Sequence, residues 1–387
     1  MFTRQFVQID FFNPRSLVLF IGILQGLIFA VLLINRSFQR KNQSDFWLGA
    51  LLISLCLSTV SDFIGFAGVY DAFKKYKDLT FFPFDNPFAY GVLIYLYVQT
   101  LTNEKRRLTR RDWLLFVPAF IFYIYQFWAF AQTMDFKNQY EKAFHIPYIS
   151  PLFTVTSIAF NAFLLILCLK HYRQYRTWLD ENYSDTEKIK FDWLRNFLYV
   201  FTAIIALTAL FNLTNNFLFK LSYMQFFWLS FANAFAIYYL AIAGYLRSQT
   251  IELRFTPPPE IIQIEPETKK NPISENDLEK FKQRLQNLMQ NDKMYLEPNL
   301  TLTDLSRQIG VNSTVLSYTI NNGFGKNFND FVNEYRIAEV KEKLKDGENT
   351  TLLGIAFDCG FNSKATFNRA FKKFTGVSPK VFQENPT

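Results

Sequence analysis

The strongest constraint in this sequence is a set of long apolar segments. Leu17–Ile34 is a run of 18 residues without one charged side chain. A helix of that length approaches the roughly 30 Å hydrocarbon thickness of a bilayer. Similar runs, each flanked by charged or turn-forming residues, follow at Phe46–Phe66, Phe84–Leu101, Trp113–Gln132, Ile149–Leu169, Phe197–Phe219 and Met224–Leu246. These segments predict a bundle of seven transmembrane helices.

Composition indicates that a soluble part follows the membrane part. The 387 residues are 50% hydrophobic and only 19% charged, which is too apolar for one soluble globule or for a disordered chain. The long apolar runs all lie before residue 247. We therefore predict an all-α chain with a transmembrane domain over 1–247, a proline-rich linker over 248–275 and a soluble domain over 276–387. The linker prolines favour a semi-rigid spacer; they are Pro257, Pro258, Pro259, Pro266 and Pro272.

The distribution of cations predicts the orientation of the spans. If the N-terminus is outside, the inner segments contain sixteen Lys and Arg residues and the outer segments eight. Basic loops favour the cytoplasmic side, so the run Lys105–Arg111 is interpreted as a topology signal rather than a nucleic-acid patch. With seven spans, the C-terminal domain lies in the cytoplasm. We expect a multi-pass protein of the inner membrane, with the lipid bilayer as one partner.

Polar residues inside the spans are candidates for sensing a signal, because each is costly in lipid unless it faces a partner or a cavity. An unknown small ligand or a membrane partner would supply that signal. The alternative is that these groups satisfy one another at the membrane interface. The candidates, all expected near the outer surface, are Asp62, Asp85, Asn212, Asn215 and Asn216.

Catalysis and bound cofactors are not expected. The chain has two histidines, His145 and His171, which form no His-Glu-x-x-His pair, and its three cysteines are scattered. A nucleophile elbow, a P-loop and a dinucleotide-binding fingerprint are all absent from the sequence. We therefore predict neither an enzyme nor a metal site.

The soluble domain shows the pattern of two helix-turn-helix units. After an amphipathic helix with Asn276 as its expected cap, the first unit spans 301–321. Thr301 and Asp304 have the spacing of a capping box, Gly310 makes the turn, and Asn312 caps the next helix. The same pattern returns over 351–374, where Gly360 takes the place of Gly310. One longer helix over 327–345 links the two units.

This arrangement resembles the DNA-binding domain of the AraC/XylS family over residues 277–383. The resemblance is carried by Tyr335-Arg336-Ile337 and Leu344, by the segments 355–363 and 367–373, and by Thr375-Gly376-Val377-Ser378-Pro379. Ser306, Val340 and Lys343 depart from the family pattern. The whole chain also resembles membrane-anchored bacterial regulators that join a multi-span region to such a domain. The resemblance implies double-stranded DNA as a partner.

The second unit concentrates the positive charge of the domain. Five cations and no acid lie between Gly360 and Phe382, so phosphate attraction would be focused there. Asn and Arg side chains can read adenine and guanine. Solvent exposure or phosphate contact is the alternative role for each candidate. The candidate DNA-binding residues are Ser313, Thr314, Ser317 and Tyr318 in the first unit, and Lys364, Ala365, Asn368, Arg369, Lys372 and Lys373 in the second.

Together these features predict a membrane-bound one-component transcription regulator. A signal received in the spans would reach the DNA-binding domain through the seventh span and the linker, or through formation of a homodimer. The rival is a multi-span receptor or transporter whose C-terminal domain binds proteins. Salt-sensitive, sequence-dependent duplex binding distinguishes the two.

Overall fold

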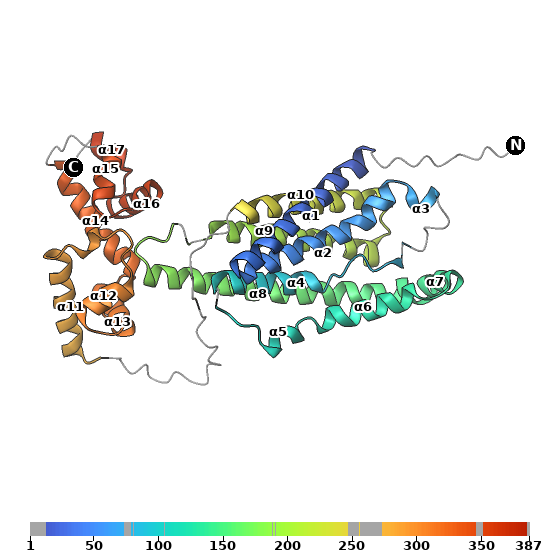
Figure 1. Ribbon diagram of the computed structural model, residues 1–387, viewed down its shortest axis with the longest axis horizontal. Helices are drawn as coiled ribbons and strands as arrows, with labels where there is room; N and C mark the ends of the chain where they lie inside the picture. Colours follow the sequence, from blue (N-terminus) through green and yellow to red (C-terminus); the bar gives the residue numbers. More distant parts are fainter. Residues whose placement is uncertain are drawn as a thin grey trace. The chain divides into compact units, whose positions relative to one another are not determined.

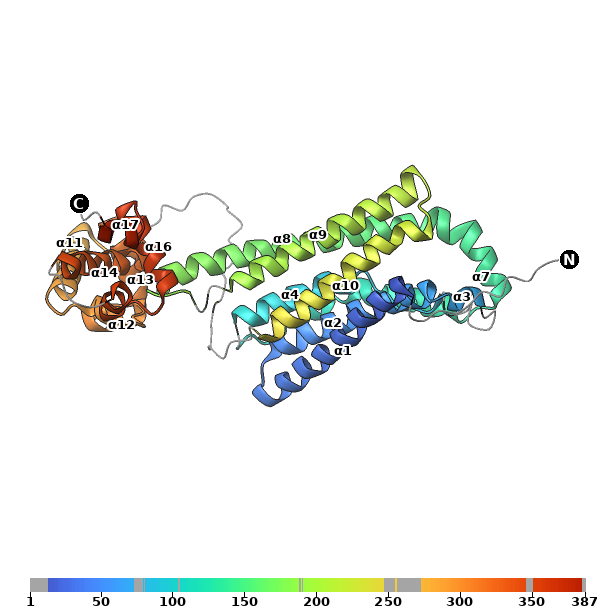
Figure 2. The ribbon, with the colours of Figure 1, turned by 90° about the horizontal axis from the view of Figure 1, so that it is seen from above.

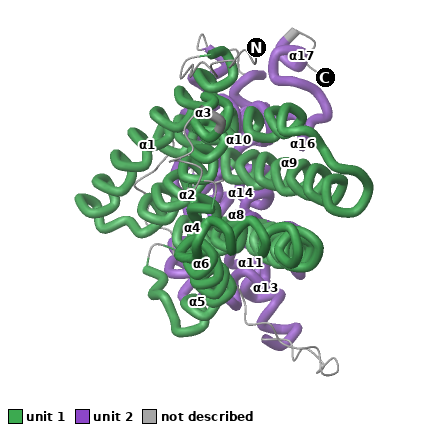
Figure 3. Tube along the Cα trace, turned by 90° about the vertical axis from the view of Figure 1, so that its right-hand side faces the viewer, with its two compact units in different colours: residues 1–172, 192–256 green, residues 173–191, 257–387 purple. Residues whose placement is uncertain are grey.

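The structure is a computed structural model that describes residues 13–72, 79, 81–103, 105–187, 189, 191–246, 255, 273–345 and 351–384. These residues are all-helical apart from loops and isolated bridge residues, among them Tyr183, which pairs with Thr301. The chain forms two compact units (Figure 3). Unit 1 comprises residues 1–172 and 192–256, and unit 2 comprises 173–191 and 257–387.

Unit 1 contains the apolar helices. In chain order they are α1 (Pro14–Arg40), α2 (Gln43–Phe66), α3 (Val69–Ala72), α4 (Ala89–Thr102), α5 (Arg110–Leu114), α6 (Val117–Phe130), α7 (Met134–Tyr140), the π-helix η2 (Glu141–Ile149), α8 (Ser150–Asn182), α9 (Asp192–Leu213), the π-helix η3 (Thr214–Leu218) and α10 (Tyr223–Leu246). α8 begins in unit 1 and ends in unit 2.

Six helical stretches within the described residues are long and apolar enough to cross a membrane: Pro14–Arg40, Gln43–Phe66, Arg110–Phe130, Met134–Asn182, Asp192–Leu218 and Tyr223–Leu246. The remaining predicted span forms α4, which has only 14 residues. Polar residues at the start of the predicted span Phe84–Leu101 explain why α4 is shorter than expected. Asn86 Nδ2 donates to the carbonyl of Ala119 at 2.9 Å, and Asn86 Oδ1 accepts from the Phe88 amide at 3.2 Å, so the helix begins only after this turn.

Helices α1, α2 and α10 lie side by side (Figures 1 and 2). Small residues allow the close approach: a Cβ placed on Gly26 would lie 2.4 Å from Ile237 and 2.5 Å from the Cys56 sulfur. Arg36 Nε forms an ion pair with Asp45 at 2.7 Å, and its Nη1 donates to the Tyr245 carbonyl at 2.8 Å. One cation of the expected cytoplasmic side therefore joins all three helices.

Unit 2 carries the helices of the soluble domain: α11 (Glu275–Gln290), the short 3-10 helix η4 (Met294–Leu296), α12 (Leu302–Ile309), α13 (Ser313–Phe324), α14 (Phe328–Lys345), α15 (Leu352–Asp358), α16 (Lys364–Thr375) and α17 (Pro379–Glu384). Helix α14 packs against α13 on one side and against α15 and α16 on the other (Figure 1). The cap of α11 is Ser274, which accepts from the Asp277 amide at 3.1 Å, so the expectation of Asn276 as the cap was wrong.

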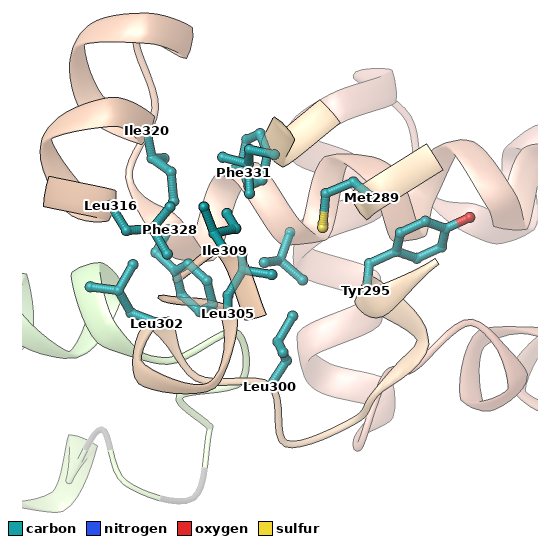
Figure 4. Close-up of a cluster of buried hydrophobic side chains, with 12 residues drawn as sticks. Met289, Tyr295, Leu300, Leu302, Leu305, Ile309, Leu316, Ile320, Phe328 and Phe331 are labelled. Atoms are coloured by element: carbon teal, nitrogen blue, oxygen red, sulfur yellow. The ribbon is translucent and has the colours of Figure 1, made fainter. Parts of the chain in front are cut away.

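Two hydrophobic clusters hold this unit together. The first joins α11, η4, α12, α13 and the start of α14 around Leu305, Leu316 and Phe331 (Figure 4). The second joins the rest of α14 to α15, α16 and α17 around Phe367 and Phe371. Each helix-turn-helix unit thus has a core of its own, and α14 contributes to both.

Candidate nucleic-acid interface

The first helix-turn-helix unit consists of α12 and α13. Thr301 and Asp304 form the predicted capping box, and Asn312 Oδ1 accepts from the Val315 amide at 2.8 Å. Gly310 between the helices has φ +75°, a left-handed conformation that glycine adopts readily. These caps and the turn fix the direction of α13, whose apolar face is buried in the first cluster.

The predicted DNA-binding residues of α13 lie on its first two turns. Thr314 is exposed, whereas Ser313, Ser317 and Tyr318 are partly buried. The Ser313 hydroxyl lies 3.2 Å from that of Ser306, one of the residues that depart from the family pattern. An alanine at position 306 would have no such hydroxyl. Ser306 therefore contributes to positioning the start of α13.

The second helix-turn-helix unit consists of α15 and α16. Ser363 caps α16 through the Thr366 amide at 3.1 Å. Phe367, Ala370 and Phe371 form the buried face of the helix. The predicted contact residues are all on the exposed remainder of the helix: Lys364, Ala365, Asn368, Arg369, Lys372 and Lys373.

Helix α14 carries a buried arginine between the two helix-turn-helix units, and the guanidinium of this Arg336 lies 5.7 Å from the ring centre of Phe361 in the second cluster. Arg336 is fully buried, and its Nε donates to the Tyr295 carbonyl and its Nη2 to the Glu297 carbonyl, each at 2.7 Å. Burial lowers the pKa of Arg336 to about 10, which still leaves it charged at neutral pH. A charged group buried at this depth is tolerated because carbonyl oxygens accept its protons. Arg336 is a structural residue rather than a DNA contact.

Two of the six predicted residues of α16 form ion pairs. The Lys373 ammonium lies 2.6 Å from Asp330 of α14, and the Arg369 guanidinium is paired with Glu187, which follows α8 in unit 2. Glu187 and its neighbour Asp185 were not identified from the sequence as parts of this site. Only the fold brings them to α16, because Glu187 is 182 residues from Arg369 along the chain.

The predicted sensing residues lie on α2, α9 and η3 and in the loop before α4, all in unit 1. Asp62 of α2 accepts from the Ser230 hydroxyl of α10 at 2.6 Å. Asp85 accepts from the Tyr90 hydroxyl and lies close enough to Asp62 for the two carboxyl groups to interact electrostatically. The three asparagines make separate bonds: Asn212 to the Thr208 carbonyl, Asn215 to the Leu221 amide and Asn216 to the Thr154 hydroxyl, each at 3.0 Å. Within the described part of the chain, no cluster of His, Cys, Asp and Glu residues has the arrangement of a metal site.

Comparison with known proteins agrees with this geometry. Residues 305–385 match the helix-turn-helix domain family. The C-terminal part of this chain is an AraC-type helix-turn-helix domain. An uncharacterized HTH-type transcriptional regulator of Staphylococcus aureus (strain COL) is 33% identical over 91 residues, which is 24% of this chain and 12% of the relative. The probable transcription factor PqrA of Proteus vulgaris is 36% identical over 63 residues, which is 16% of this chain and 51% of PqrA.

Each of these matches covers a quarter of this chain or less. A solved structure from Listeria innocua, titled as a protein of unknown function, is 27% identical and covers 26% of this chain and 93% of its own, with a TM-score of 0.24. The chain spans 12% of the length of the Staphylococcus relative and about half of PqrA. A helix-turn-helix domain supports binding to double-stranded DNA in transcription regulation.

Proposed function

We propose that this protein is a membrane-bound one-component transcription regulator that binds specific DNA through both helix-turn-helix units. The observation that carries the proposal is the joint support of α13 and α16 by the single helix α14. A rigid pair of recognition helices can enter successive major grooves on one face of the duplex, about one helical turn apart. The six long apolar helices support attachment to the membrane.

The charge and exposure of α16 support a role in base reading and phosphate binding. Asn368 and Arg369 are exposed on the same helix, and both side-chain types make bidentate contacts to bases. Lys364, Lys372 and Lys373 surround them and would neutralise phosphates. The side chains of α13 are uncharged, so the first unit would add shape and hydrogen bonds rather than electrostatic attraction.

Selection of genomic fragments tests this function. The full chain in lipid nanodiscs is incubated with fragmented DNA of the source organism, and bound fragments are recovered over several rounds. The proposal predicts enrichment of discrete sequences whose binding weakens steeply as salt rises. The same selection is carried out with an Asp185→Asn/Glu187→Gln variant, which lacks the two carboxylates that contact α16. Recovery of random DNA only, or of none, with both proteins would contradict the proposal.

Membrane topology supplies a second test. We propose seven spans, with α4 and the turn before it as the short third crossing, so that the N-terminus is outside and the AraC-type domain is inside. A phosphatase reporter fused after Gly68 is then active, and one fused after Arg107 is inactive. The reverse pattern would place the AraC-type domain outside and exclude transcription regulation.

The sensing site is proposed at the polar residues near the outer ends of the spans. The bond between Asp62 and Ser230 joins α2 to α10, and that between Asn216 and Thr154 joins the η3 region to α8. A ligand that binds two helix arrangements unequally would shift the population between them. Asp62→Asn and Asn215→Ala should insert normally yet lose the transcriptional response. Normal responses in both variants would place the sensing site elsewhere.

A further inference from the structure

The connection between α8 and α9 belongs to unit 2 together with the AraC-type domain (Figure 3). We call residues Tyr183–Glu187 the acidic connection. It makes two kinds of contact. Hydrogen bonds at its first residues anchor it to Leu300, which precedes α12, and to α14. The carboxylates of Asp185 and Glu187 contact α16.

The anchor is a set of buried hydrogen bonds around Ser184. Ser184 is fully buried, and both its amide and its hydroxyl donate to the Leu300 carbonyl, at 3.2 and 2.7 Å. From α14, Asn329 Nδ2 donates to the carbonyls of Tyr183 and Ser184, at 3.0 and 2.8 Å. Arg336 Nη2 adds a bond to the Ser184 hydroxyl at 3.3 Å. The connection therefore lies on the same buried arginine that joins the two helix-turn-helix units.

The two carboxylates of the acidic connection contact side chains of α16. Asp185 Oδ1 accepts from the Thr366 hydroxyl at 3.0 Å, and Glu187 accepts from Arg369. A carboxylate offers arginine the same paired acceptors that a guanine edge or a phosphate offers. Glu187 binds Nη2 of Arg369 and neutralises the charge of the guanidinium, which weakens the attraction of Arg369 to a phosphate or a base edge. The acidic connection and DNA therefore compete for Arg369.

The contact between the connection and α16 is incompletely packed. A cavity of about 200 Å³ remains there, lined by residues that include Thr186, Asn333 and Lys373. Asn333 is buried, and its Oδ1 has no hydrogen-bond partner among the residues that the structure describes. Voids and unpaired buried acceptors both weaken an interface. The acidic end is thus held mainly by an exchangeable ion pair and one hydroxyl bond.

We propose that the acidic connection is an autoinhibitory element that holds Arg369 on the DNA-binding face of α16 and must release it before a cognate duplex binds. The inference rests on the proposed function, since it concerns the regulation of that same surface. It also supplies a route for the signal. Because the connection joins α8 to α9, a change in these two helices reaches α16 without passing through the linker 248–275.

Duplex affinity of the full chain in nanodiscs tests the inference, using DNA selected with the Asp185→Asn/Glu187→Gln variant. That variant should bind roughly two- to fivefold more tightly than the parent, which is the range expected from releasing an exposed ion pair. Asn329→Ala, which weakens the anchor and keeps every charge, should also tighten binding. The matched controls Glu279→Gln and Asn287→Ala, both on the exposed side of α11, should change affinity less than 1.5-fold.

The outcomes separate this inference from the proposed function. Glu279→Gln removes one negative charge and the double variant removes two. If Glu279→Gln therefore produces half of the double variant's gain in binding free energy, the effect is a general charge effect and the autoinhibitory role is wrong. If Asn329→Ala and the double variant bind the selected duplex with parental affinity, autoinhibition fails while the proposed function stands. If no variant selects a sequence, the proposed function itself fails.

Hydrogen exchange gives a readout that does not depend on mutation. The amide of Ile189 donates to the Thr186 carbonyl at 3.1 Å, and that of Glu187 to Asp185 Oδ1 at 3.0 Å. Displacement of the connection by a saturating selected duplex should speed exchange in a peptide that spans 183–189. Unchanged exchange in this peptide, with DNA bound, would overturn the inference.

Discussion

Gly360→Ala should destabilise the AraC-type domain far more than the equivalent change Gly310→Ala. The two glycines occupy corresponding turns and have similar left-handed φ values, +87° and +75°. Their surroundings differ. A Cβ on Gly360 would lie 2.6 Å from the Tyr295 carbonyl oxygen and 2.8 Å from that of Leu296, whereas a Cβ on Gly310 would meet nothing within 4 Å.

The magnitude follows from these contacts. A left-handed alanine costs about 1 kcal/mol at either position. At Gly360 the backbone of η4 must also move, and overpacking of this kind costs about 1–3 kcal/mol. The Tyr295 carbonyl accepts from Arg336, so its displacement weakens a charged hydrogen bond worth about 1.5–3 kcal/mol. We therefore expect a loss of about 3–5 kcal/mol for Gly360→Ala and about 1 kcal/mol for Gly310→Ala.

Urea unfolding of a fragment of residues 271–387, followed by far-ultraviolet circular dichroism, measures the two losses. The midpoint of Gly360→Ala should fall by more than that of Gly310→Ala, with the slope of free energy against urea unchanged. Equal losses for the two variants would show that η4 does not press against Gly360. The contact of η4 with Gly360 would then not help to hold the two helix-turn-helix units together.

Two further predictions concern charges of the domain. Burial raises the pKa of Glu339, but hydrogen bonds from Lys293 and Tyr295 outweigh this effect and hold it below the usual value. The stabilisation by the Glu339 carboxylate is therefore present above the pKa that this group has in the unfolded chain, and it is lost as the pH falls through the lowered pKa of the folded protein. Urea unfolding at pH values between 7 and 3 should therefore show a smaller loss of stability for Glu339→Gln than for the parent. In duplex binding, Arg369→Ala should cost about 1–3 kcal/mol on a cognate site and relax discrimination at one base pair, whereas Lys373→Ala should weaken all duplexes alike and reduce the salt slope. Equal losses on cognate and random DNA for Arg369→Ala would identify a phosphate contact.

Local signals in the sequence were sufficient to predict the helix-turn-helix units. The capping box of Thr301 and Asp304, the cap at Asn312 and the turn at Gly310 all lie within a few residues of the helices that they delimit. The assignment of the α11 cap failed because Ser274 and Asn276 are both good capping residues. The capping residue is the one whose side chain accepts a hydrogen bond from the backbone amide three residues further along, and in α11 this residue is Ser274.

Tertiary contacts account for what the sequence did not predict. The short α4 depends on a bond between Asn86, in the turn before it, and Ala119 of α6. The pairing of Arg369 with Glu187 depends on Ser184 being held at Leu300, 116 residues away. A polar loop between two apolar helices shows no periodicity that would reveal such a partner. Sequence patterns therefore predicted a candidate DNA-binding surface and did not predict the acidic connection that contacts it.

A hydroxyl-radical footprint of the full chain on a selected duplex tests the central claim most directly. Two recognition helices fixed to one linking helix should protect two windows on the same face of the DNA, about one helical turn apart. Thr314→Ala should weaken protection in one window and Asn368→Ala in the other. A single protected window, or loss of the same window in both variants, would contradict the claim that both units bind DNA.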